Sequence, residues 1–272
     1  MATKGISLHI GLNRVDSTHY GGWDGALTAC EADAKDMLAI AKKQKFSPRI
    51  LLTSAVTSAN VISAISSVAG ALQAGDIFWL TYSGHGGQVP DTNQDEPDRQ
   101  DETWVLYDRE LVDDELYALW GQFKTGVRIT VLSDSCHSGT VVRAMPPRPG
   151  TAGAVAGRAR LMPPDVALRT YRAHQALYDG IQRATPAGEK AVIKATVLLI
   201  SGCQDNQTSL DGARNGLFTE KLRKVWSNGK FNGGYRALHD QIVTLMPATQ
   251  RPNYFKAGAA SQKFETQKPF TI

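Results

Sequence analysis

The 272-residue sequence has little that marks a secreted, membrane-spanning or nucleic-acid-binding protein. Its three cysteines, an odd number at wide spacing, form no disulfide framework and fit a reducing compartment, so we expect a cytoplasmic protein. No apolar run approaches the roughly 18–20 residues that span a membrane, and no long apolar stretch follows the first basic residues, so we expect neither a membrane span nor a signal peptide. No run of lysine and arginine alternates with aromatic residues, which argues against a nucleic-acid partner.

The composition is that of a globular protein with a substantial core, since 42% of the residues are hydrophobic and 21% are charged. The net charge of +4 is unevenly distributed along the chain. Residues 91–114 hold ten acids and two bases, whereas residues 141–200 hold nine bases and three acids. No internal repeat is present. We expect one domain over residues 1–272, and a monomer.

Apolar runs of strand length alternate with segments of helical periodicity, which predicts a mainly parallel sheet covered by helices on both faces. The expected fold class is therefore a three-layer α/β/α architecture. Strands are predicted at 5–12, 49–53, 76–83, 103–107, 127–133 and 195–201, with edge strands in the tail between Tyr254 and Phe270. Helices are predicted at 29–44, 58–74, 112–123, 165–183, 216–227 and 234–245.

Two of these strands end abruptly in small and polar residues. The strand at 127–133 continues into Asp-Ser-Cys-His-Ser-Gly, which places Cys136 at its carboxyl end. The strand at 76–83 continues into Gly-His-Gly-Gly, which places His85 at its carboxyl end. Active sites of open α/β sheets lie at this edge. Right-handed crossovers predict that the two strands are parallel neighbours, so His85 and Cys136 should emerge together.

A thiol and an imidazole at one strand edge permit nucleophilic catalysis. A cysteine is a nucleophile only as the thiolate, and a neighbouring imidazole can accept its proton and later give one to a leaving amine. The backbone N–H groups of Gly86 and Cys136 can face a developing oxyanion, and glycine permits the close approach. The residues therefore predict a cysteine peptidase.

Residues 143–194 differ in character from the rest of the chain. They form a basic connector, with prolines and glycines at its start and the helix expected at 165–183, between a large first region at 1–142 and a smaller last region at 195–272. A peptidase that cuts after arginine can cut itself in such a connector. The candidate positions are its first four arginines, Arg143, Arg148, Arg158 and Arg160.

The motifs together resemble those of the metacaspases, caspase-like cysteine peptidases whose simple prokaryotic members are also called orthocaspases. The matching stretches are Tyr82–Gln88, the run from Asp98 to Thr103, Asp113–Leu116, Asp134–Gly139, and Ile200–Ser209 followed by Gly216–Thr219. The resemblance covers nearly the whole chain, with the motifs in the same order.

The resemblance implies a caspase-like fold, a dyad of His85 and Cys136, and cleavage of protein or peptide substrates after Arg or Lys. Asp134 and Asp33 match the acids of the pocket that receives this side chain. Ser83 and Cys30 match the remaining wall of that pocket. Two carboxylates in the pocket would pair with a basic side chain and repel an aspartate.

Many metacaspases need calcium, and the family's ligands map onto Asp101, Asp113 and Asp114. A fourth acid, expected soon after Gly139, is absent, and Arg143 stands in that stretch. Calcium prefers six to eight oxygen ligands, so the resemblance specifies a calcium site only in part. The chemistry itself requires no cofactor. Two alternatives stay open: a catalytically quiet caspase-like module that associates with other proteins, and an Asp-directed peptidase.

Overall fold

The computed structural model describes residues 2–92, 99–136, 158–185, 192–203 and 207–272. The strands are β1 (Gly5–Gly11), β2 (Ser47–Leu52), β3 (Ile77–Ser83), β4 (Gly86–Pro90), β5 (Gln100–Val105), β6 (Glu110–Val112), β7 (Arg128–Asp134), β8 (Arg158–Ala159), β9 (Thr196–Ser201), β10 (Leu210–Asp211) and β11 (Asn253–Gly258). The α-helices are α1 (Cys30–Lys43), α2 (Ser58–Ala71), α3 (Asp113–Gly121), α4 (Pro164–Ala173), α5 (Gln175–Ala184), α6 (Leu217–Trp226), α7 (Tyr235–Leu245) and α8 (Gln262–Thr266).

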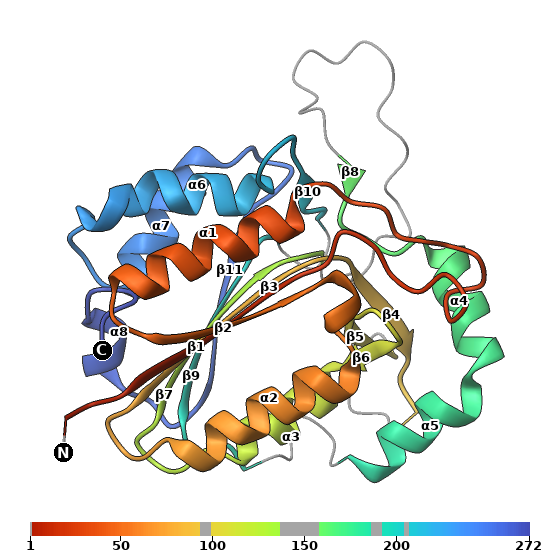
Figure 1. The fold of residues 1–272 in the computed structure, drawn as a ribbon, viewed down its shortest axis with the longest axis horizontal. Helices are drawn as coiled ribbons and strands as arrows, with labels where there is room; N and C mark the ends of the chain where they lie inside the picture. Colours follow the sequence, from red (N-terminus) through yellow and green to blue (C-terminus); the bar gives the residue numbers. More distant parts are fainter. Residues whose placement is uncertain (1, 93–98, 137–157, 186–191, 204–206) are drawn as a thin grey trace.

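A six-stranded sheet in the order β11-β9-β7-β3-β1-β2 forms the centre of the fold. Neighbouring strands from β9 to β2 pair in parallel, and β11 pairs antiparallel with β9 at one edge. Helices α1, α6 and α7 cover one face of the sheet, and α2 and α3 cover the other (Figure 1). The predicted three-layer α/β/α class is confirmed.

Strand β3 shows why both faces need a helical layer. All seven of its residues are buried, and successive side chains point to opposite faces. Phe78 and Leu80 join the core cluster on the α2 side, whereas Ile77 and Trp79 join the cluster on the α6 side. Such a strand reads as a continuous apolar run, which is typical of a parallel sheet buried on both faces.

Smaller strands gather at the carboxyl edge of the sheet. Strands β4, β5 and β6 form an antiparallel sheet there, and β8 pairs with β10. Helices α4 and α5 flank this end of the molecule (Figure 1). Of the part of the chain that the structure describes, no helix is both long and apolar enough to span a membrane.

Two sequence-based expectations about secondary structure were wrong. The helix predicted at 165–183 is two helices, because the chain leaves the helical conformation at His174, whose ring Nε2 lies 3.1 Å from the carbonyl oxygen of His19. The tail contains helix α8 as well as an edge strand. Ser261 caps that helix by accepting the N–H of Phe264 at 3.3 Å, and the Phe264 side chain is buried in the core.

Candidate active site

The ends of β3 and β7 bring His85 and Cys136 to the same edge. The strands are parallel neighbours whose register ends with Ser83 opposite Asp134. His85 and Cys136 each lie two residues beyond that last pair, and both side chains are buried. The predicted neighbouring strands are therefore present, with the two groups at matching levels.

The His85 ring is oriented by the loop between β1 and α1. Its Nε2 lies 3.0 Å from the carbonyl oxygen of Gly25. A carbonyl only accepts, so Nε2 carries the hydrogen and Nδ1 keeps the lone pair. The ring also packs against Trp23, with centroids 4.8 Å apart. Burial lowers the pKa of His85 to about 4, so the imidazole is neutral and able to accept a proton at neutral pH.

The Cys136 thiol is completely buried in this conformation. Its Sγ accepts the backbone N–H of Ser209 at 2.9 Å. Burial raises the pKa of Cys136 well above its ordinary value, and the neighbouring thiol of Cys203 adds to the rise. The sulfur is therefore protonated while it stays covered, and the Ser209 N–H is placed to stabilise a thiolate once the proton leaves.

The side chain of Arg160 fills a pocket of carboxylates between α1 and the strand ends. It is fully buried. Its Nη2 lies 2.7 Å from Asp33 Oδ2 and 3.0 Å from Asp211 Oδ1. Its Nη1 lies 3.0 Å from Asp134 Oδ2 and donates to Ser83 Oγ at 2.8 Å. The pocket therefore holds a guanidinium through three ion pairs.

The main chain around Arg160 adopts the geometry of a bound peptide. The Arg160 carbonyl oxygen accepts the N–H of Gly86 at 3.0 Å and the N–H of Cys136 at 3.2 Å. The Arg160 N–H donates to the Ser209 carbonyl at 2.8 Å, and β8 runs antiparallel to β10 just before it. On the other side, the Met162 N–H donates to the Gly86 carbonyl at 2.8 Å. The carbonyl of Arg160 thus receives both N–H groups that were predicted to face an oxyanion.

Gly86 is essential to this arrangement. A Cβ at this position would lie 1.6 Å from the carbonyl oxygen of Cys136. Any other residue would push the two backbones apart and separate the two N–H donors that share the Arg160 carbonyl. The close approach of the two backbones therefore explains why this position requires glycine.

The pocket acids are held in place by the protein itself. Asp134 accepts the N–H and hydroxyl of Thr219, at 3.1 and 2.8 Å, and the hydroxyl of Ser209 at 2.7 Å. Asp211 accepts the N–H and hydroxyl of Thr28, at 2.8 and 2.9 Å. Bonds from the rest of the protein, and not from Arg160 alone, therefore fix these carboxylates.

Asp33 and Cys30 lie on the first turn of α1, against the same pocket. Burial raises the pKa of Asp33 to about 6, and the Arg160 guanidinium opposes that rise. Burial raises the pKa of Cys30 to about 12, so this thiol is neutral. Cys30 interacts electrostatically with Asp33 and Arg160, consistent with the predicted position in the pocket wall.

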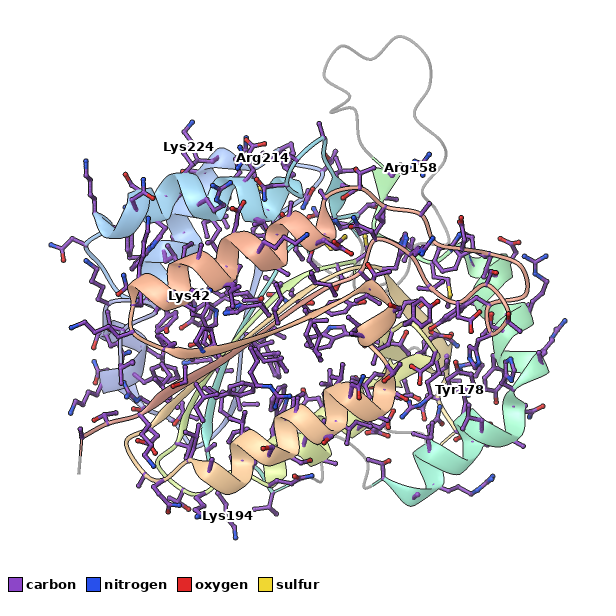
Figure 2. All side chains as sticks on the ribbon, viewed as in Figure 1. Lys42, Arg158, Tyr178, Lys194, Arg214 and Lys224 are labelled. Carbon is purple, nitrogen blue, oxygen red and sulfur yellow. The ribbon has the colours of Figure 1, made fainter. Side chains whose placement is uncertain are left out.

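Sequence reasoning missed Asp211, the third carboxylate of the pocket. One feature of the sequence pointed to it: Asp211 follows by two positions the stretch Ile200–Ser209, which resembles a metacaspase motif. The Trp23 and Gly25 contacts to His85 were also missed. Of the four self-cleavage candidates, Arg143 and Arg148 lie outside the described residues. Arg158 is exposed at β8, where Figure 2 labels it, and donates to the Ala26 carbonyl at 3.0 Å.

The predicted calcium ligands lie close to one another, near the start of α3. Burial raises the pKa of Asp113 well above its ordinary value, and Glu102, Asp101 and Asp114 raise it further, so the four carboxyl groups lie near one another. Yet among the residues that the structure describes, no three His, Cys, Asp or Glu side chains converge on a point where they could hold a metal. Calcium prefers six to eight oxygens, and a calcium site at these carboxyl groups stays a prediction.

Comparison with known proteins gives a consistent result. The family profile of Peptidase C14, described as the caspase domain, matches residues 15–264. Metacaspase-1A of Aspergillus fumigatus is 29% identical over 262 residues, covering 81% of this chain and 62% of the relative. Metacaspase-1 of Mycosarcoma maydis is 30% identical over 251 residues, covering 80% of this chain and 60% of the relative. The chain thus spans about three fifths of the length of these curated relatives.

A solved structure is also similar. It is the crystal structure of a Geobacter sulfurreducens protein, a structural genomics target, whose sequence is 57% identical to this chain; the TM-score is 0.90 and the match covers 99% of both chains.

Proposed function

Because the chain belongs to the caspase-domain family of cysteine peptidases, Peptidase C14, we propose that it is a metacaspase-type endopeptidase that cleaves after Arg or Lys. In this proposal Cys136 is the nucleophile and His85 the general base. Asp33, Asp134 and Asp211 bind the basic side chain of the substrate, with Ser83 as a further polar partner. Proteins or peptides with an exposed basic residue are the substrates.

One observation carries this proposal: Arg160 occupies the site as a substrate would. Its guanidinium pairs with three carboxylates, while its carbonyl oxygen accepts the N–H groups of Gly86 and Cys136. A lysine ammonium carries the same charge, but it lacks the planar fork that reaches several carboxylates at once. We therefore expect Arg to be preferred over Lys. An aspartate in this pocket would face three like charges, which argues against Asp-directed cleavage.

The geometry supports a four-step reaction. The Cys136 thiol gives its proton to Nδ1 of His85, and Sγ attacks the carbonyl carbon of the basic residue. The carbonyl oxygen becomes an oxyanion held by the N–H groups of Gly86 and Cys136. Collapse of this intermediate breaks the peptide bond, and His85 gives the proton to the leaving amine. Water then attacks the thioester, and its proton returns the thiol while the new carboxylate leaves.

The same geometry supports self-processing at the bond between Arg160 and Leu161. This cut would yield fragments 1–160 and 161–272. Intact mass of the wild-type protein against Cys136→Ala tests it: the wild type should show the two fragments, and the variant should show only the full chain. Identical single masses in both proteins would refute self-cleavage at this bond.

Reporter peptides test the proposed specificity directly. We expect cleavage of Arg and, more slowly, of Lys reporters, and none of Asp reporters, with all activity lost in His85→Ala and Cys136→Ala. Absence of cleavage of every reporter, together with no labelling of Cys136 by an Arg-ketone probe, would favour the quiet interaction module. Monomeric state, cytoplasmic location and the absence of nucleic-acid partners remain predictions.

A further inference from the structure

A second cysteine lies at the end of the strand next to the nucleophile. Strands β7 and β9 are parallel neighbours whose register ends with Ser133 opposite Ser201. The pairing continues for one more step, because the Gly202 N–H donates to the Ser133 carbonyl at 2.7 Å. Cys203 follows immediately, so it stands one residue step away from the level of Cys136.

The contacts at this level keep the two sulfurs close. Cys203 Sγ donates to the carbonyl of Ser135, the residue before the nucleophile, at 3.5 Å. The Cys203 thiol is also near enough to raise the pKa of Cys136. Adjacent strands are about 4.8 Å apart. The Cα atoms of a disulfide are usually about 4.4–6.8 Å apart, a range that matches neighbouring strands. The spacing of β7 and β9 therefore falls in the range that a disulfide between their ends needs.

We propose that Cys203 is a resolving cysteine, and that peroxides convert Cys136 and Cys203 into a reversible intramolecular disulfide that switches the enzyme off. The inference rests on the proposed function in that Cys136 is the reactive nucleophile. Its sulfur must be able to form a thiolate when the site is open, and thiolates are the forms that peroxides oxidise.

The chemistry proceeds in two balanced steps. The Cys136 sulfur attacks a peroxide oxygen, the O–O bond breaks, and the products are a sulfenic acid and an alcohol, or water when the oxidant is hydrogen peroxide. The Cys203 sulfur then attacks the sulfenic sulfur, an S–S bond forms, and water leaves. Two thiol hydrogens have been removed and the peroxide has been reduced. A dithiol reductant converts the disulfide back to the two thiols by thiol–disulfide exchange.

The docked Arg160 segment controls access to this chemistry. Both cysteines are fully buried while the Arg160 carbonyl sits over Cys136. Oxidation therefore requires the site to open, as it must for any substrate. A peroxide that reaches the open site would meet Cys136 with its resolving partner already beside it. The disulfide would protect the nucleophile from irreversible oxidation to the sulfinic acid.

Cys30 offers a matched control because it is as deeply buried as the other two cysteines. It lies at the start of α1, where the Ser83 side chain and the charges of Arg160 and Asp33 act on its pKa. Buried cysteines are usually inert packing residues. A switch specific to one pair should therefore leave Cys30 unmodified.

Peptide mapping tests the proposal without requiring peptidase activity. Trypsin separates the three cysteines into peptides 15–35, 129–143 and 195–214. The protein is treated with hydrogen peroxide, its free thiols are alkylated, and the digest is analysed by mass spectrometry. We expect 129–143 joined to 195–214, two hydrogens lighter than the separate peptides, with the link lost after a dithiol reductant. In Cys30→Ser the same link should form.

Activity against an Arg reporter provides the second readout, with each protein compared with its own untreated sample. The wild type should recover most activity with a dithiol reductant, whereas Cys203→Ser should recover none and should carry Cys136 as a sulfinic acid. A wild-type digest with no 129–143 to 195–214 link would overturn the proposal whether or not the variant folds. If the protein is inactive on all reporters and the link still forms, the peptidase is refuted and only the reversible disulfide between Cys136 and Cys203 is left standing.

Discussion

Replacing Arg160 by glutamine should empty the site while preventing the cut. The guanidinium is fully buried and makes ion pairs of 2.7, 3.0 and 3.0 Å with Asp33, Asp134 and Asp211. Removing one partner of a buried charged pair costs about 3–5 kcal/mol, because the opposing charge is left uncompensated. The protein can avoid that cost only by releasing the segment and letting water reach the carboxylates. At about 1.4 kcal/mol per factor of ten, the docked population should fall roughly 100-fold or more.

Alkylation of Cys136 measures that shift. The comparison is made in a His85→Ala background, which cannot cut itself, so the covering segment stays continuous and the thiol chemistry is the same in every sample. Adding Arg160→Gln should raise the alkylation rate of Cys136 by about two orders of magnitude. Adding Arg158→Gln, which removes only an exposed bond to the Ala26 carbonyl, should leave the rate unchanged.

The outcome that would refute this reasoning is equal alkylation in the two doubly substituted proteins. It would mean that the ion pairs do not hold the segment over the thiol. A second readout comes from proteins with His85 intact. There Arg158→Gln should be cut after residue 160, and Arg160→Gln should stay whole.

Four further outcomes follow from the same contacts. Asp134→Asn should abolish cleavage after Arg while Cys136 stays alkylatable, as reporter peptides and mass spectrometry would show; a retained Arg preference would contradict the pocket. The pKa of Asp33 is raised to about 6 by burial, so cleavage after Arg should fall as pH drops through about 6, and Asp33→Asn should lose this limb in a pH–rate profile. Burial raises the pKa of Glu110 from 4.5 to about 8. Between these two pH values the folded state keeps a proton that the unfolded chain has released, so the free energy of unfolding falls as the pH rises from about 4.5 to about 8. In protein that cannot cut itself, Glu110→Gln should therefore raise the free energy of unfolding more at pH 8 than at pH 5, by about 3–5 kcal/mol at most, and a larger increase in Tm at pH 8 would report it. Asp101, Glu102 and Asp114 raise the pKa of Asp113, so a cation would relieve the repulsion among these carboxyl groups; if calcium binds there, reporter cleavage should be higher with calcium than with a chelator, and equal cleavage would count against the site.

The sequence carried enough information to predict the sheet and the positions of its two central functional groups. Apolar runs that end suddenly in glycine, serine and aspartate indicate buried strands and their carboxyl ends. Parallel pairing then places His85 and Cys136 at matching levels, as the register of β3 and β7 bears out. These predictions depend on local patterns and on one handedness rule, so they need no knowledge of side-chain packing.

The pocket was only partly predictable, because its members meet over long sequence separations. The contact of Arg160 with Asp33 joins residues 127 positions apart, and Asp211 comes from a two-residue strand with no periodic signal. The occupancy of the pocket by Arg160 was also beyond sequence reasoning, since four arginines in the connector were equivalent as candidates. The break at His174 arose from a tertiary contact with the loop at His19, which overrides helical periodicity.

The pocket is assembled from both sides of the proposed cut, which makes a final prediction. Fragment 1–160 would supply Asp33, Asp134 and Cys136, whereas fragment 161–272 would supply Ser209 and Asp211. Strand β9 lies between β7 and β11 in the sheet, so the second fragment is held by a full parallel strand pairing and by the core around α6. The two fragments should therefore elute as one complex from a sizing column and separate only in denaturant. The complex should keep reporter activity, because separation would remove a carboxylate and the N–H that supports the Cys136 sulfur. Fragments that elute apart while full activity stays with 1–160 alone would show that Ser209 and Asp211 are not part of the working site.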